Sequence, residues 1–146
     1  MSDAPTTGRA RIAVVADDLI WATRLQDGVT RAGADPIGIR SASALSATLP
    51  SVAGCLVDLT ARAYDGIEAV RAATSAGVPV IAVGQHDDAE TRRAATDAGA
   101  SRVYAYRALF EHGDRVLGAW IATLTPDLTD TEAPMPGPAT TPERIA

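Results

Sequence analysis

The stretch Ala53-Gly54-Cys55-Leu56-Val57-Asp58 decides the fold class. Its first five residues are small or apolar and do not alternate with polar ones, a pattern typical of a strand buried on both faces of a parallel sheet. Asp58 closes this strand at the end where open α/β sheets place their ligands. Since Asp also favours turns, the stretch by itself is equally compatible with a carboxylate that only ends the strand.

Composition indicates an ordinary globular protein with one domain. The chain has 146 residues, of which 47% are hydrophobic and 21% charged, enough for a substantial core. A net charge of -5 argues against direct nucleic-acid binding, which normally needs a basic patch. All 13 basic residues are Arg, so chemistry that needs a lysine ammonium is excluded, and the single Cys55 excludes an internal disulfide.

Strand and helix patterns alternate along the middle of the chain. Residues 1–10 are expected to be a disordered leader, and residues 125–146, with five of the nine prolines and four acids, a disordered Pro-rich acidic tail. Between them, the predicted domain, 11–124, holds five strands (12–16, 36–39, 54–58, 78–83, 102–106) and five helices (19–32, 41–49, 65–77, 87–97, 108–124). This order predicts βαβ units, hence a doubly wound parallel sheet of the flavodoxin-like class with strand order 2-1-3-4-5.

Acidic residues follow two of these strands. Asp17 and Asp18 come directly after the first strand, and Asp58 ends the third. Because parallel strands all end at one edge, and strands one and three are neighbours in the 2-1-3-4-5 order, the three carboxylates are expected to converge there. Such oxygen ligands suit Mg²⁺, although acids after strands are also common as solvated loop residues.

In this order and spacing, the chain resembles the receiver domain of two-component response regulators from Arg11 to about Ile121. The residues that carry the resemblance are the stretch 11–18 with its terminal acids, Leu56-Val57-Asp58 followed seven residues later by Asp65-Gly66, and Ala98-Gly99-Ala100-Ser101 before the last strand. The resemblance implies that Asp58 stands at the phospho-acceptor position. It also implies Mg²⁺ ligation by Asp17, Asp58 and the backbone carbonyl of Thr60, with Asp18 as a further candidate.

The same resemblance exposes departures at the positions that switch a receiver. Strand four ends in Gly84 where the family has Thr or Ser, and Tyr106-Arg107 replaces a Lys followed by Pro. Val103 aligns with the switch aromatic, with Tyr104 one place later. A phenol cannot supply the positive charge that stabilises a phosphoryl group, and Arg is not equivalent to Lys there.

The leading hypothesis is therefore an atypical receiver or pseudo-receiver, a signalling module that acts through protein–protein interaction without conventional aspartyl-phosphate switching. One alternative is a working single-domain phospho-receiver that accepts phosphate on Asp58 with Mg²⁺ and uses Arg107 in place of Lys. The other is a flavodoxin-like domain that binds a small molecule, although no Gly-rich phosphate loop follows the first strand. No nucleophile–base pair is visible, so an enzyme is not expected.

The resemblance also suggests partners. A sensor kinase or a downstream target would bind the face formed by the fourth helix, fifth strand and fifth helix, where Tyr104, Arg107 and Phe110 lie, and a homodimer could form through that face. The sequence shows neither a signal peptide nor a membrane span, which favours a cytoplasmic location without membrane contact.

Overall fold

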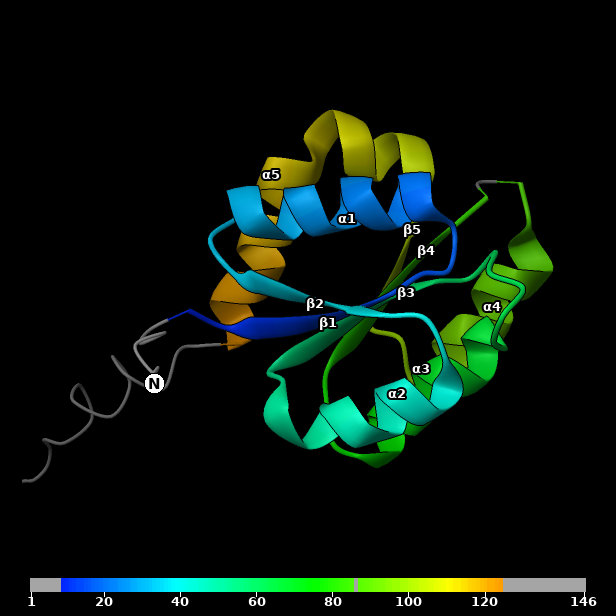
Figure 1. The fold of residues 1–146 in the computed structure, drawn as a ribbon. Helices are drawn as coiled ribbons and strands as arrows, with labels where there is room; N and C mark the ends of the chain where they lie inside the picture. The colour runs from blue at the N-terminus through cyan, green and yellow to red at the C-terminus, as the bar shows by residue number, and fades with distance from the viewer. Residues whose placement is uncertain (1–8, 86, 125–146) are drawn as a thin grey trace, which may run out of the picture.

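The computed structural model describes residues 9–85 and 87–124 (Figure 1). The predicted tail and residues 1–8 of the predicted leader lie outside this range. Arg9 and Ala10 were assigned to the leader and belong to the domain instead. Arg9 pairs with Asp35 at 2.8 Å and donates to the Ala34 carbonyl at 3.1 Å, while Ala10 is buried.

Five parallel strands form one sheet in the order β2-β1-β3-β4-β5, which confirms the predicted flavodoxin-like topology. Their bounds are β1 Arg11–Val15, β2 Asp35–Ile39, β3 Gly54–Asp58, β4 Val80–Gly84 and β5 Arg102–Ala105. In β3 and β4 all five residues are buried, because these strands lie inside the sheet and helices cover both faces. Asp58 pairs in register with Val83, so the ends of β3 and β4 lie side by side.

Helices cover the two faces of the sheet, with α1 and α5 on one side and α2, α3 and α4 on the other (Figure 1). The bounds are α1 Leu19–Arg31, α2 Ala42–Thr48, α3 Gly66–Ser75, α4 Ala89–Ala98 and α5 Tyr106–Leu124. Alternate residues of a strand point into two hydrophobic cores on opposite faces of the sheet. Cys55 and Val57 pack toward α3, and Leu56 packs toward α1 and α5. Within the described residues, no helix is long and apolar enough to span a membrane.

Local side-chain hydrogen bonds explain where the helices begin. Asp18, Ser41, Asp65 and Asp88 each cap a helix by accepting N–H bonds from its first turn. The α2 helix ends at Thr48, and Pro50 sits inside a short 3-10 turn, η2 Leu49–Ser51, whose first positions tolerate proline.

The start of β4 and the end of β5 differ from their predicted positions. Strand β4 starts at Val80, two residues later than predicted. Tyr106 was predicted to end the fifth strand, but it is the first residue of α5, which follows β5 without any intervening loop. The α5 helix is kinked at His112, whose backbone is not helical (φ -127°, ψ 21°).

Gly99, which ends α4, offers a test of this packing. Its φ is +123°, and a Cβ there would clash with the Thr74 side chain, whose own Cβ lies 2.8 Å away, whereas Gly77 (φ +78°) has nothing within 4 Å. Gly99→Ala should lower the free energy of unfolding by at least about 2 kcal/mol, since strain and a clash add. Gly77→Ala should cost about 1 kcal/mol from strain alone. Urea denaturation compares them, and equal losses would contradict the α3–α4 packing.

Candidate functional site

Asp58 lies at the carboxyl end of β3 and is only 1% exposed, the one buried charged side chain within the described residues. One of its carboxylate oxygens, Oδ1, accepts hydrogen bonds from the Thr60 N–H at 2.9 Å and the Thr60 hydroxyl at 2.8 Å. The same oxygen accepts a short hydrogen bond from the hydroxyl of Tyr106. Neutral donors therefore compensate the buried carboxylate, as a buried charge requires.

Tyr106 is held over Asp58 by aromatic stacking. Its ring stacks on Trp21 of α1 with centroids 4.4 Å apart, and Trp21 also stacks on Phe110, one turn further along α5, at 5.0 Å. The Arg24 guanidinium lies 5.5 Å from the centroids of both Trp21 and Phe110. This contact between α1 and α5 fixes the direction of the Tyr106 side chain.

The environment of Tyr106 favours its neutral, hydrogen-donating form. Burial raises the pKa of its phenol, and the hydrogen bond to Asp58 raises it further, while the neighbouring Thr60 hydroxyl acts in the opposite direction. The hydroxyl oxygens of Thr60 and Tyr106 are 2.7 Å apart. Asp58, Thr60 and Tyr106 thus form a compact cluster of three oxygens.

Asp17 is held separately by the loop after β3. Its Oδ2 accepts the backbone N–H groups of Ala63 at 2.7 Å and Arg62 at 2.8 Å, and these bonds lower the pKa of its carboxyl. The carboxylate of Asp18 caps α1 through Ile20 and Trp21. Both acids therefore act in positioning the backbone at this edge.

The predicted metal ligands each make hydrogen bonds within the protein. Among residues 9–85 and 87–124, no three His, Cys, Asp or Glu side chains are grouped to hold a metal ion. Asp17, Asp18 and Asp58 each present an oxygen to an N–H or O–H donor. Thr60 engages Asp58 through its amide and hydroxyl, which leaves its carbonyl available. The hydrogen bonds to Asp17 and Asp58 use one carboxylate oxygen of each, so the other oxygens and the Thr60 carbonyl could still contact Mg²⁺.

Tyr64, which sequence reasoning did not single out, joins the two strands that carry the acids. Its hydroxyl lies 2.7 Å from the carbonyl oxygen of Val15 and 2.9 Å from that of Asp58. Burial raises the pKa of this phenol, and the nearby Asp58 charge raises it further. The contact ties the end of β1 to the end of β3.

The predicted switch positions Gly84, Val103 and Arg107 differ in their burial and in their contacts. Gly84 is buried at the end of β4, and a Cβ there would make only an ordinary contact, 3.5 Å from Leu59 Cδ1, so a hydroxyl-bearing side chain could be accommodated. Val103 packs toward the α3–α4 core. The Arg107 side chain is 85% exposed and pairs with Glu111 at 3.8 Å.

Of the three side chains predicted to form the interaction face, one is exposed. Arg107 is exposed, but Tyr104 is half-buried and packs toward the α1–α5 core. Phe110 is half-buried and stacks on Trp21 of α1. Apolar periodicity along α5 marks its buried side, and Phe110 follows that rule.

Two pockets are each lined by Trp21 and Thr60, which both contact Tyr106. The first, about 430 Å³, is lined by Asp17, Asp18, Trp21, Thr60 and Arg62. The second, about 670 Å³, lies over the ends of β4 and β5. It is lined by Trp21, Thr60, Gly84, Gln85, Ala105, Tyr106, Arg107, Ala108, Glu111 and His112.

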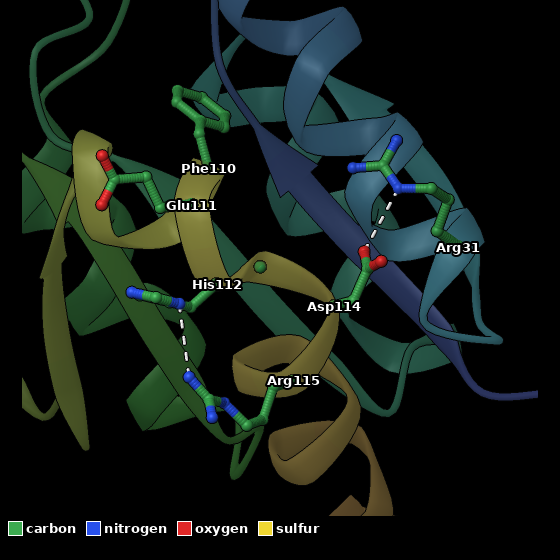
Figure 2. Close-up of a pocket in the computed structure, with 7 residues that line it drawn as sticks. Arg31, Phe110, Glu111, His112, Asp114 and Arg115 are labelled. Carbon is green, nitrogen blue, oxygen red and sulfur yellow. Dashed lines mark hydrogen bonds and ion pairs between the residues drawn. The ribbon is translucent and has the colours of Figure 1, made fainter.

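A third pocket, of about 360 Å³, opens at the kink of α5 (Figure 2). Asp114 pairs there with Arg31 of α1 at 3.2 Å, and Arg115 contacts His112 Nδ1 at 3.3 Å. Exposed pairs of this kind contribute little to stability, and the acids of the β1 and β3 ends do not line the pocket. The chemistry of the site therefore centres on Asp58 and the two pockets beside Tyr106.

Solved structures with the same fold are receiver domains and proteins that contain them. The chain matches a beryllofluoride-activated DrrB receiver domain with a TM-score of 0.64 and 18% identity, over 80% of this chain and 97% of that one. It matches the receiver domain of a Pseudomonas aeruginosa sensor histidine kinase, with magnesium coordinated in the active-site cleft, at 0.65 and 19%, over 79% and 99%.

The chain also matches NtrX from Brucella abortus, determined with ADP, at a TM-score of 0.71 and 16% identity, over 90% of this chain and 31% of that one. No protein-family model matches the sequence, and no curated protein is significantly similar to it. At these identities the comparisons establish that the chain has the receiver-domain fold.

Sequence reasoning located Asp58 and the substituted switch positions but missed how Tyr106 is used. The spacing of Tyr106 and Phe110, four residues apart at a helix start, was a usable signal, because such residues share one helix face. Their partner Trp21 lies far away in the sequence, so no local sequence pattern predicts the aromatic stack. Only the fold brings the three rings together.

The raised phenol pKa values predict the alkaline behaviour. A tyrosine in the unfolded chain ionises at about pH 10, whereas Tyr64 and Tyr106 in the folded protein ionise at higher pH. Their contribution to the free energy of unfolding is therefore complete below about pH 10 and is lost as the pH rises further. Tyr106→Phe should cost about 1–2 kcal/mol at pH 7 and flatten the decline above pH 10. Urea melts across pH 7–11 measure both, and an unchanged alkaline slope would contradict the assignment.

Proposed function

We propose that this chain is a receiver-like signalling module that acts through a protein partner and does not switch by conventional phosphorylation of Asp58. The observation that carries the proposal is the hydrogen bond from Tyr106 to the buried carboxylate of Asp58. Phosphoryl transfer to a carboxylate requires its oxygen to approach the phosphorus atom in line. Tyr106 and Thr60 both donate to Oδ1 and so occupy the lone pairs that this oxygen would use to attack.

The charges around Asp58 support the same conclusion. Phosphoryl transfer is driven largely by cationic groups that stabilise the charge on the transferred oxygens. The nearest substitute for the absent lysine is Arg107, but its side chain is 85% exposed and pairs with Glu111. Gly84 offers no hydroxyl to a phosphoryl group, so the usual coupling from phosphate to surface lacks a side chain to move.

The alternative is a working phospho-receiver that uses Mg²⁺. It is favoured by the fold and by the retention of Asp17 and Asp58 at the ends of neighbouring strands β1 and β3. This function would require Tyr106 to leave Asp58. That change breaks a hydrogen bond at the end of β3, so we rank it second.

Output is proposed to pass through a partner protein. NtrX and full-length FixJ from B. japonicum, whose structures are similar, are longer than this chain, which covers 31% and 63% of them. Candidate partners are a sensor kinase, a downstream target or a second copy bound at the α4–β5–α5 face. Arg107 is the exposed side chain of the predicted face that could contact them.

Intact-protein mass spectrometry after treatment with acetyl phosphate and Mg²⁺ tests the proposal. The unmodified chain should show no stoichiometric adduct of about 80 Da. The double variant Tyr106→Lys with Gly84→Ser, which restores an ammonium and a hydroxyl beside Asp58, should gain one. Adding Asp58→Asn to that variant should remove the adduct.

A stoichiometric adduct on the unmodified chain that Asp58→Asn abolishes would overturn the proposal in favour of the phospho-receiver. Arg107→Ala then separates two versions of that alternative. Loss or faster decay of the adduct would assign Arg107 the role of the missing lysine, and an unchanged lifetime would exclude it from that role.

A further inference from the structure

We propose that the 670 Å³ pocket over the ends of β4 and β5 binds a small planar aromatic anion without covalent chemistry. The inference deepens the proposed function, because a bound ligand would supply an input that does not use phosphate on Asp58. Neither Asp58 nor Asp17 lines this pocket, so it is distinct from the acceptor carboxylate and from the acidic pocket beside it.

The pocket exists because small residues form part of its lining. Gly84 ends β4, Ala105 ends β5, and Ala108 lies in the first turn of α5, so no large side chain fills the space above the strand ends. Its volume falls within the range of about 300–1,000 Å³ that is usual for small-molecule sites. Such a site at the carboxyl ends of parallel strands is where open α/β folds bind ligands.

Aromatic side chains on the pocket wall indicate what kind of molecule fits. Trp21 and Tyr106 both line the pocket and are stacked on each other at 4.4 Å, and Phe110 stacks on Trp21 from the next turn. Tyr106 is further held by its hydrogen bonding to Asp58. A wall fixed in this way offers ring edges and faces to a planar aromatic ligand, which gains from offset or edge-to-face contact as well as from area burial.

A guanidinium at the rim can bind an anion. Arg107 lines the pocket together with His112 and one acid, Glu111. The Arg107–Glu111 pair is long, at 3.8 Å, and exposed, so little is lost when Arg107 turns to another carboxylate. The guanidinium can bind a ligand carboxylate through two parallel N–H bonds, a geometry that its contact with Glu111 does not provide.

Tyr106 connects the pocket to Asp58. The phenol ring forms part of the pocket wall, while its hydroxyl hydrogen-bonds to Asp58 and lies 2.7 Å from the Thr60 hydroxyl. A ligand packed against this ring would bias the position of Tyr106, of its stacking partner Trp21 and of the start of α5. Occupancy of the pocket therefore reaches both α1 and α5 through one side chain.

Titration with 2-naphthoate, and with uncharged 2-naphthamide as its matched control, tests the site. In ¹⁵N-labelled protein, 2-naphthoate should bind with a Kd in the millimolar range or tighter, shifting amide signals near Gly84 and Arg107. Ala108→Leu fills the pocket and should weaken binding at least about tenfold, whereas Ala119→Leu, at an exposed position of the same helix, should not. Arg107→Gln should weaken 2-naphthoate several-fold and leave 2-naphthamide unchanged.

Absence of saturable shifts at these residues, or equal effects of Ala108→Leu and Ala119→Leu, would overturn the ligand site. Equal binding of the naphthoate and the naphthamide would overturn its preference for anions. The acetyl phosphate experiment is separate. Phosphorylation together with probe binding would refute the proposed function alone, and an unphosphorylated protein without probe binding would refute the ligand site alone.

Discussion

The hydrogen bond between Tyr106 and Asp58 is the interaction on which the site depends. A buried carboxylate is costly unless charged or polar partners replace its water, and here the partners are a phenol, a hydroxyl and an amide N–H. No side-chain cation within the described residues hydrogen-bonds to it or pairs with it. Charge-assisted hydrogen bonds are roughly twice as strong as neutral ones, so these three donors offset part of the cost of burying the carboxylate.

This hydrogen bond affects several elements of the fold because Tyr106 also contacts a second helix. It opens α5 directly after β5, and its ring stacks on Trp21 of α1. The contact therefore links the third strand, the fifth helix and the first helix. Tyr64 ties β1 to β3 on the neighbouring side. Two tyrosines thus hydrogen-bond at the carboxyl ends of the strands, and one of them, Tyr106, lines the pocket over Gly84.

Local chemistry made most of the fold predictable. The uninterrupted apolar stretch before Asp58 identified a buried parallel strand, and the predicted helices 65–77 and 87–97 start within one residue of the caps Asp65 and Asp88. The start of α5 was not predictable in this way. Tyr106 has high β-propensity and follows β5 with no turn residue, so sequence extended the strand into the helix. Spacing also placed Asp17 at the correct edge but could not show that backbone N–H groups occupy its oxygen.

A double-mutant cycle on the free energy of unfolding tests the central claim most directly. The cycle combines Tyr106→Phe with Asp58→Ala, and a control cycle combines Tyr104→Phe with Asp58→Ala, since Tyr104 lies on β5 without a hydrogen bond to Asp58. The account predicts a coupling energy of about 1–3 kcal/mol for the first pair and additivity within about 0.5 kcal/mol for the second. Additivity in both cycles would show that Tyr106 does not hold Asp58 in solution and would contradict the account.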